Sequence, residues 1–151
     1  MTENDQSGAQ EPLGYAGDIA PTEAWQVLAD NPKAVLLDVR TPEEWTYVGL
    51  PNLDALHHEV CLVPWVFFPR MDLNPQFIEQ LKASAHPDPD TSILILCRSG
   101  VRSVAAAKAL TSSGFTDCYN ILHGFEGNPD TNNQRGKISG WKVDGLAWRQ
   151  K

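Results

Sequence analysis

The feature of this sequence that points most directly to chemistry is a cysteine followed closely by two arginines. Residues 97–103 read Cys-Arg-Ser-Gly-Val-Arg-Ser. An apolar run typical of a buried strand ends directly before Cys97, and an alanine-rich run typical of a helix follows at residues 101–112. Cys97 is therefore expected between the end of a strand and the start of a helix.

A cysteine in this position is expected to be partly or fully ionised. The first N–H groups of a helix have no partner inside the helix, and together with the helix dipole they bind anions. Gly100 allows the loop to curl so that these N–H groups converge, and Arg98 and Arg102 add positive charge. Such surroundings favour the thiolate, which is the nucleophilic form. We therefore predict that Cys97 is a nucleophile, and a persulfide anion formed on it would be stabilised in the same way.

Strands alternating with helices are predicted to position this cysteine. Such alternation is typical of an α/β fold with a mostly parallel sheet, in which ligands bind beyond the carboxyl ends of the strands. Thr41 begins a helix with a capping box that ends on Glu44, and Asp18 or Thr22 is predicted to cap the preceding helix. The predicted strands are residues 34–39, 59–66, 92–96 and 118–122, and the predicted helices are residues 21–29, a helix from 41, a helix from 74 to about 83, and residues 101–112.

Length, charge and cysteine content exclude several classes of protein. The 151 residues suit one domain, and the net charge of −7 argues against a nucleic-acid binder, which needs a basic face. No apolar run approaches the roughly 18 residues that span a membrane. Residues 1–14 are polar and unlike a secretory signal, so a flexible arm and a cytoplasmic location are predicted. The three cysteines form no Cys-x-x-Cys pair, which argues against a structural zinc site or a disulfide framework.

Three motifs resemble those of single-domain rhodaneses, the thiosulfate:cyanide sulfurtransferases. The run 97–103 resembles the active-site loop of that family, and residues 37–45, Leu-Asp-Val-Arg-Thr-Pro-Glu-Glu-Trp, are similar to its upstream motif. Residues 119–125, Tyr-Asn-Ile-Leu-His-Gly-Phe, resemble its closing strand and turn. The resemblance implies a rhodanese-like, three-layer α/β/α fold around a mostly parallel sheet of about five strands. It divides the chain into an arm (1–14), a rhodanese domain (15–127) and an extension (128–151) that packs back on the domain.

The resemblance also implies a mechanism. Cys97 would attack the outer sulfur of a donor such as thiosulfate, release sulfite, and pass the sulfur from its persulfide to a nucleophile such as cyanide, a thiol or a carrier protein. The implied partners are a small anionic sulfur donor and a protein or thiol acceptor, with no cofactor, metal, nucleic acid or membrane. The implied site comprises Cys97 as the nucleophile, Arg98, Ser99, Gly100, Val101, Arg102 and Ser103 as the loop that binds the substrate, and Asp38 and Arg40 in support.

Two other functions remain open from the sequence. A rhodanese-like module that binds or senses without turnover would be expected to lack the cysteine, which is present here. The second alternative is a phosphatase or arsenate reductase, because the dual-specificity phosphatases of the cell cycle share the fold and also use a cysteine and an arginine. Five residues separate the two in those enzymes, whereas four separate Cys97 from Arg102, and the shorter loop favours a single sulfur atom.

Three ionisable residues near the loop, Asp38, Arg40 and His123, each have more than one interpretation. Asp38 is expected to brace the active-site loop, and Arg40 is expected to pair with Glu44 or Glu43, although both could instead polarise the site. His123 stands where many relatives have glycine, and it is expected to face solvent in a turn rather than to approach the loop.

The positions of the two remaining cysteines and of three aromatic residues, in the core or at the active site, also remain open. Cys61 and Cys118 are expected in the core, where cysteine behaves as a small hydrophobe; the alternative is that one of them resolves the persulfide as a disulfide. Trp65, Phe67 and Phe68 are expected mainly in the core, with the rim of the active site as the alternative.

Overall fold

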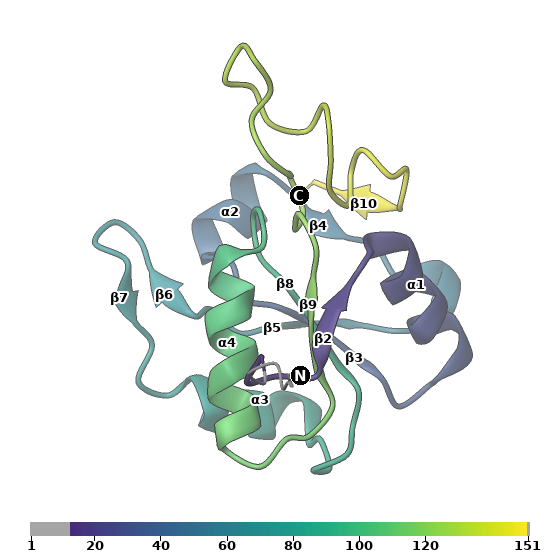
Figure 1. Cartoon of the computed structure of the whole chain (residues 1–151), viewed down its shortest axis with the longest axis vertical. Coiled ribbons are helices and arrows are strands. Elements are labelled where there is room, and N and C mark those ends of the chain that lie inside the picture. Colours follow the sequence, from purple (N-terminus) through teal and green to yellow (C-terminus); the bar gives the residue numbers. More distant parts are fainter. Residues whose placement is uncertain (1–12, 151) are drawn as a thin grey trace, which may run out of the picture.

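A sheet of five parallel strands forms the centre of the molecule (Figure 1). The computed structural model describes residues 13–150. From one edge to the other, the strands are β2 (Gly17–Ile19), β9 (Cys118–Ile121), β8 (Ile93–Leu96), β3 (Val35–Asp38) and β5 (Val60–Leu62). This order confirms the predicted α/β fold with a mostly parallel sheet of about five strands. It also places β8, which leads into Cys97, in the middle of the sheet.

The central strand β8 is apolar throughout because both faces of the sheet are covered. Ile93 and Ile95 point into one core cluster, whereas Leu94 and Leu96 point into the other, and all four are fully buried. In the register of the sheet, Asp38 at the end of β3 lies beside Leu96 at the end of β8. The carboxyl ends of these strands therefore form one edge, and Cys97 lies on it.

Helices cover both faces of the sheet, as the predicted three-layer arrangement requires. The helix α1 (Pro21–Asp30) buries Ala24 and Leu28 in one core cluster. The helices α3 (Phe77–Ala85) and α4 (Val101–Ser112) pack against the opposite face, where Phe77, Leu81 and Leu110 are buried. Figure 1 shows α4 and α3 together on one side of the strands and α1 on the other.

The short helix α2 (Pro42–Tyr47) begins as the sequence predicts, whereas α1 does not. The Thr41 hydroxyl accepts a hydrogen bond from the Glu44 N–H, and the Glu44 carboxylate accepts one from the Thr41 N–H, which is the predicted capping box. The predicted caps of α1, Asp18 and Thr22, are wrong. Ala20 is the residue at the cap, and its N–H is satisfied by the Glu23 carboxylate one turn into the helix.

The predicted strand at residues 59–66 is wrong in its extent. Only β5 belongs to the sheet, at its edge, and Leu62 at its end is 36% exposed. Pro64 has no N–H group to donate, and the chain leaves the sheet after Trp65, whose N–H still donates to the Val39 carbonyl at 3.0 Å. It forms an antiparallel hairpin of β6 (Val66–Phe67) and β7 (Asp72–Leu73) before α3, which begins three residues later than predicted.

The last part of the chain returns to the face covered by α1. Trp141 is fully buried in the same cluster as Leu36 and Leu94, and its ring lies edge-on to that of Trp25, with the ring centres 6.0 Å apart. The final strand β10 (Trp148–Arg149) pairs with β4 (Leu50–Pro51), which precedes the 3-10 turn η1 (Asp54–Leu56). The predicted boundary at residue 127 stays a prediction, and residues 1–12 of the predicted arm lie outside the described residues. No helix in the described part of the chain is both long enough and apolar enough to cross a membrane.

Candidate active site

Cys97 occupies the turn between β8 and α4, where the sequence predicts it. Gly100 is the residue at the start of α4 and has φ of 106°, a conformation that glycine adopts without strain. This turn brings the Gly100 N–H to 3.0 Å from the Cys97 sulfur. The Ser103 hydroxyl lies 3.2 Å from the same sulfur. Cys97 is only 1% exposed, so the turn encloses the thiol closely.

The turn after β9 holds the cysteine loop from its other side. The Phe125 N–H donates to the Cys97 carbonyl at 2.8 Å, and the Glu126 N–H donates to the Arg98 carbonyl at 3.0 Å. Gly124 makes this approach possible, because a Cβ atom there would collide with the carbonyl groups of Cys97 and Arg98. The third predicted motif, residues 119–125, thus contacts the first through backbone hydrogen bonds.

The two arginines of the loop have different surroundings. Arg102 donates two hydrogen bonds to the Glu44 carboxylate, at 2.7 and 2.9 Å, and both side chains are more than four-fifths buried. Burial raises the pKa of Glu44, but the hydrogen bonds from Arg102 and from the Thr41 backbone outweigh it and leave that pKa below its ordinary value. The Arg102 charge is therefore compensated by an ionised carboxylate. Arg98 is exposed and makes no ion pair with any described residue.

Asp38 and Arg40 form a buried pair with each other. Both are fully buried, and the Arg40 guanidinium donates to Asp38 at 2.7 Å and to the Gly49 carbonyl at 2.8 Å. The expected pairing of Arg40 with Glu44 or Glu43 is therefore wrong, because Asp38 lies only two residues away on the same strand end. Within residues 13–150, the Asp38 carboxylate accepts hydrogen bonds from Arg40 alone and none from the cysteine loop. The pair reaches the loop indirectly, since the Arg40 guanidinium lies 4.2 Å above the Phe125 ring.

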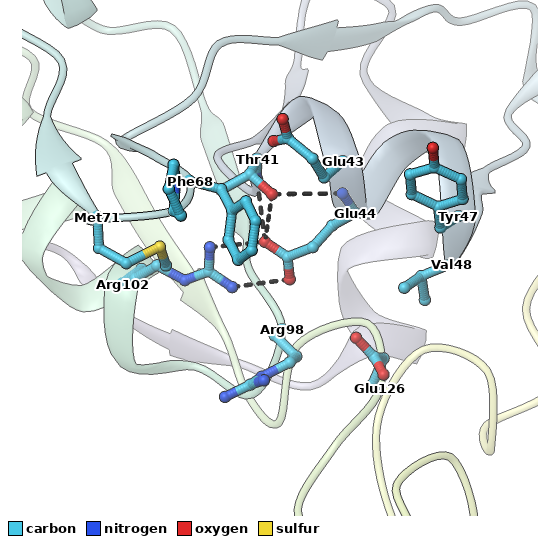
Figure 2. A pocket seen from close by; sticks show the side chains of 11 residues that line it. Thr41, Glu43, Glu44, Tyr47, Val48, Phe68, Met71, Arg98, Arg102 and Glu126 are labelled. Carbon is cyan, nitrogen blue, oxygen red and sulfur yellow. Dashed lines mark hydrogen bonds and ion pairs between the residues drawn. The ribbon is translucent and has the colours of Figure 1, made fainter.

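A pocket of about 580 Å³ opens beside the loop (Figure 2). The β6–β7 hairpin and α2 supply an apolar wall with Phe68 and Tyr47, which are 59% and 78% exposed. Figure 2 shows Arg102 and Glu44 facing each other at the pocket wall and Arg98 lying apart from that pair. The residues that line the pocket are Thr41, Glu43, Glu44, Tyr47, Val48, Phe68, Pro69, Met71, Arg98, Arg102 and Glu126.

Three aromatic residues were expected mainly in the core, and the structure separates them. Trp65 is partly buried and packs edge-on against the core residue Phe77 of α3, with ring centres 5.0 Å apart. Phe67 and Phe68 are 42% and 59% exposed, so the core assignment is wrong for both. They lie on the hairpin, which leaves the sheet after β5.

The comparisons with known proteins agree on the family. A family described as the STR4 middle domain matches residues 16–151. An uncharacterised protein of Rickettsia prowazekii is 40% identical over 132 residues, covering 87% of this chain and 96% of its own. The crystal structure of Rv0390 from M. tuberculosis has a TM-score of 0.83 and 44% identity, covering 91% of this chain and 99% of its own.

One relative, from Arabidopsis thaliana, is named for an enzyme activity. The chloroplastic thiosulfate sulfurtransferase 16 is 34% identical over 92 residues, covering 59% of this chain and 68% of its own length. The chain belongs to the rhodanese-like family. This confirms the resemblance found in the three sequence motifs.

The rhodanese-like site also contains polar residues that sequence reasoning missed. The Ser103 hydroxyl donates to the Asn120 side chain at 2.5 Å, and the Asn120 amide donates to the Asp18 carboxylate at 3.0 Å. Asn120 comes from β9 and Asp18 from β2, so only the strand order brings them to Ser103. Glu44 was recognised as a helix cap, but its contact with Arg102 spans 58 residues and has no local signal.

The other two cysteines of the rhodanese-like chain lie away from the loop. Cys118 is paired in register with Ile93, four residues before Cys97, which places it roughly 13 Å along the sheet. Cys61 pairs with Leu37, which pairs with Ile95, so two strand spacings of about 5 Å separate it from β8. A disulfide needs Cα atoms within about 7 Å, so neither can resolve a Cys97 persulfide without rearrangement. Burial raises the pKa of each thiol to about 11.

The histidines of this rhodanese-like chain do not gather at the site as metal ligands. His58 lies 2.8 Å through its Nε2 from the Leu28 carbonyl, on the α1 side. His123 has φ of 65°, and its backbone N lies beside Gly100, whereas the residue is exposed, as predicted for a turn. Within residues 13–150, no group of three or more His, Cys, Asp or Glu side chains is arranged to hold a metal ion.

Proposed function

We propose that this rhodanese-like chain is a sulfurtransferase in which Cys97 carries the sulfur as a persulfide. The observation that supports it best is the Cys97 sulfur at the start of α4, 3.0 Å from the Gly100 N–H. A helix N-terminus stabilises an anion there, and it does so equally for a thiolate and for a persulfide. The proposed reaction passes through the thiolate and the persulfide in turn.

In the proposed reaction, the Cys97 thiolate attacks the outer sulfur of thiosulfate. A sulfur–sulfur bond forms to Cys97, and the bond between the two sulfur atoms of thiosulfate breaks, so that sulfite leaves with the electron pair. A nucleophilic acceptor then attacks the outer sulfur of the persulfide. With cyanide the product is thiocyanate, and the Cys97 thiolate is regenerated as the leaving group.

The residues around the sulfur have distinct proposed roles. The Gly100 N–H stabilises negative charge on the Cys97 sulfur, and Ser103 bonds to the same atom. Arg98, which is exposed at the pocket, attracts an anionic donor. Arg102 serves mainly to fix α4 against α2, because Glu44 already neutralises its charge. Asp38 and Arg40 support the loop through Phe125.

The size of the pocket bears on the acceptor. A volume of about 580 Å³ is in the range of sites that hold organic molecules rather than single small ions. Its apolar wall, formed by Tyr47, Phe68 and Met71, gives an organic body something to contact. We therefore propose that an organic thiol, free or on a protein, is the acceptor, and that cyanide replaces it only in the assay. A cytoplasmic location, where thiols are kept reduced, suits such an acceptor.

The loop geometry supports sulfur transfer over phosphate hydrolysis. The Gly100 N–H already contacts the sulfur at 3.0 Å, and Cys97 is almost completely enclosed. A phosphate would need several N–H groups held apart around its oxygens. Hydrolysis of an aryl phosphate that is lost in Cys97→Ser would favour the phosphatase instead.

Intact-protein mass spectrometry tests the proposal most directly. The protein is treated in parallel with thiosulfate, a low-molecular-weight persulfide and 3-mercaptopyruvate, and a gain of one sulfur atom is expected with at least one donor. Cys97→Ser should abolish the gain, whereas the matched control Cys61→Ser should keep it, because burial raises the pKa of Cys61 to about 11 and leaves it protonated. Thiocyanate formation from thiosulfate and cyanide should follow the same pattern. Equal rates for wild type and Cys97→Ser would refute the sulfurtransferase assignment, and a protein that never gains sulfur would be a binding module.

A further inference from the structure

A line of hydrogen bonds runs from the Cys97 sulfur across the sheet to the surface. The Ser103 hydroxyl lies 3.2 Å from the sulfur and donates to the Asn120 Oδ1 at 2.5 Å. The Asn120 Nδ2 donates to the Asp18 carboxylate at 3.0 Å, and the Tyr15 hydroxyl donates to the same carboxylate oxygen at 2.8 Å. Ser103 and Asn120 are at most 4% exposed, whereas Asp18 is exposed on the edge strand β2.

The direction of each hydrogen bond follows from counting protons. An ionised carboxylate only accepts, so Asp18 must receive the amide hydrogen of Asn120. Burial raises the pKa of Tyr15, and the hydrogen bond and charge of Asp18 raise it further, so Tyr15 keeps its proton and is also a donor to Asp18. The amide of Asn120 is thereby oriented with its oxygen towards Ser103.

This orientation leaves Ser103 with no hydrogen for the sulfur. A serine hydroxyl has one hydrogen, and the Asn120 oxygen takes it. The same hydroxyl oxygen can then only accept from Cys97, and the Cys97 thiol has a hydrogen to donate. The protonated thiol therefore satisfies every member of the line, whereas a thiolate would face the oxygen of Ser103 without a hydrogen between them.

We propose that Asp18 and Asn120 are positioning residues that hold Ser103 as an acceptor, so that a Cys97 thiolate gains the Ser103 hydrogen only when Ser103 gives up its hydrogen bond to Asn120. When the proton leaves the sulfur for solvent, the Ser103 hydroxyl turns from Asn120 to the sulfur. The buried Asn120 oxygen then loses its donor, which raises the cost of ionisation. Without the Asn120 oxygen as an acceptor, the Ser103 hydroxyl can donate to the sulfur without breaking another hydrogen bond. Cys97 should then ionise at lower pH.

The ionisable groups on the elements around the cysteine loop are unchanged by this rearrangement. They come from the loop and α4, from the ends of β3 and β9, and from α2, and Arg102 is the one whose charge interacts with Cys97. The groups are Arg98, Arg102, Asp38, Arg40, Glu44 and His123. A comparison between variants that retain all six isolates the effect of Ser103.

Two variants of the full chain release Ser103 in different ways. Asn120→Leu removes the acceptor oxygen, keeps the same branching of side-chain heavy atoms and leaves the Asp18 charge in place. Asp18→Ala, at an exposed position, frees the Asn120 amide to turn and donate to Ser103. In both, the Ser103 hydrogen becomes available to the sulfur. Each change is also made in a Ser103→Ala background, so that an effect transmitted through Ser103 can be separated from a direct effect of charge.

The measurement is the pH dependence of alkylation of Cys97 by iodoacetamide, followed on the peptide that contains Cys97. A hydrogen bond to an ion is worth about one pH unit, so the midpoint should fall by about that amount in Asn120→Leu and in Asp18→Ala. In the Ser103→Ala background both shifts should disappear. The Asp18→Ala shift should also persist at high salt, because it does not arise from a screened charge.

The outcomes decide the proposal independently of sulfur transfer, because alkylation needs no sulfur donor. An unchanged or raised midpoint in the variants overturns it, and so do equal shifts with and without Ser103. Far-ultraviolet circular dichroism confirms that each variant is folded before it is titrated. Should the buried Asn120→Leu fail to fold, the exposed Asp18→Ala pair carries the test on its own.

Discussion

Glu44 determines how much positive charge Arg102 offers to a ligand. The carboxylate caps α2 through Thr41 and holds the Arg102 guanidinium by two hydrogen bonds, so one side chain joins two helices at the wall of the pocket. The exposed Arg98 is then the loop cation that is left without an ion pair among residues 13–150. At the scale of single residues, the attraction for an anionic donor is therefore weaker than two arginines in one loop suggest.

Replacing Glu44 by glutamine should release the Arg102 charge. Gln retains the cap, so we expect the KM for thiosulfate to fall roughly fivefold, which corresponds to about 1 kcal/mol from one charge near the surface. Steady-state assays with thiosulfate and cyanide measure this. Glu43→Gln is the matched control, since Glu43 also lines the pocket whereas Arg102 is paired with Glu44. Equal changes in KM for the two variants would show that releasing Arg102 has no effect.

The same ion pair predicts how stability depends on pH. The pKa of Glu44 in the folded protein lies below its ordinary value of 4.5, since the hydrogen bonds of Arg102 and Thr41 outweigh the opposing effect of burial. A carboxylate of this kind stabilises the fold above pH 4.5, and that contribution is lost as the pH falls through the folded-state pKa. Wild type should exceed Glu44→Gln by about 1 kcal/mol in the free energy of unfolding at pH 7. Urea unfolding should show this difference shrinking below pH 4.5, and a constant difference would contradict the prediction.

At the scale of elements, two turns from different parts of the chain build the site together. The turn after β8 carries Cys97, and the turn after β9 holds it in place through the Cys97 and Arg98 carbonyls. Parallel strands make this possible because their carboxyl ends meet at one edge. The geometry of the thiol therefore depends on Gly124, which makes no contact with the sulfur itself.

A methyl group at Gly124 should displace the cysteine loop. Gly124 has φ of 60°, and a Cβ atom there would overlap the backbone of Cys97 and Arg98. We expect Gly124→Ala to lower the free energy of unfolding by about 2–3 kcal/mol and to reduce the rate of thiocyanate formation at least tenfold.

Gly114→Ala is the matched control for that change. Gly114 also has a positive φ, of 105°, but a Cβ atom there would meet no other atom within 4 Å. It should therefore cost about 1 kcal/mol of stability from backbone strain and leave the rate unchanged. Similar losses of rate in both variants would show that backbone strain alone, and not the contact with the loop, matters at Gly124.

The elements that sequence patterns could predict are those with a local signal. The buried strand before Cys97, the capping box at Thr41 and the glycine at the start of α4 all depend on neighbours within a few residues. The predicted strand at residues 59–66 extends too far, to the first residue of the hairpin, because an exposed apolar wall and a buried strand have the same composition. The contacts of Arg102 with Glu44 and of Ser103 with Asn120 depend on strand order, which residue spacing does not contain.

At the scale of the whole molecule, the end of the chain completes one face of the core. Trp141 is buried against α1 and donates its indole N–H to the Ala147 carbonyl at 2.9 Å. Lys142 lies between the rings of Phe125 and Trp148, at 5.1 and 3.9 Å from their centres. Because the Arg40 guanidinium also lies over the Phe125 ring, this segment contacts the residues that support the cysteine loop.

Truncating Trp141 should destabilise the whole molecule. We expect Trp141→Ala to lower the free energy of unfolding by about 3–5 kcal/mol, because it removes a fully buried ring next to Leu36 and Leu94. Trp148→Ala is the comparison, since this ring is 40% exposed and should cost about 1 kcal/mol. Thermal and urea unfolding measure both. A Trp141→Ala protein as stable as Trp148→Ala would show that the segment is a separate appendage to the core.

The separation of the three cysteines has a consequence for oxidative damage. If a peroxide converts Cys97 to a sulfenic acid, neither Cys61 nor Cys118 is near enough to trap it as a disulfide within the chain. Further oxidation to the irreversible sulfinic acid is then prevented only by a thiol from another molecule. The enclosure of Cys97, at 1% exposure, is the protection that the fold itself provides against peroxide.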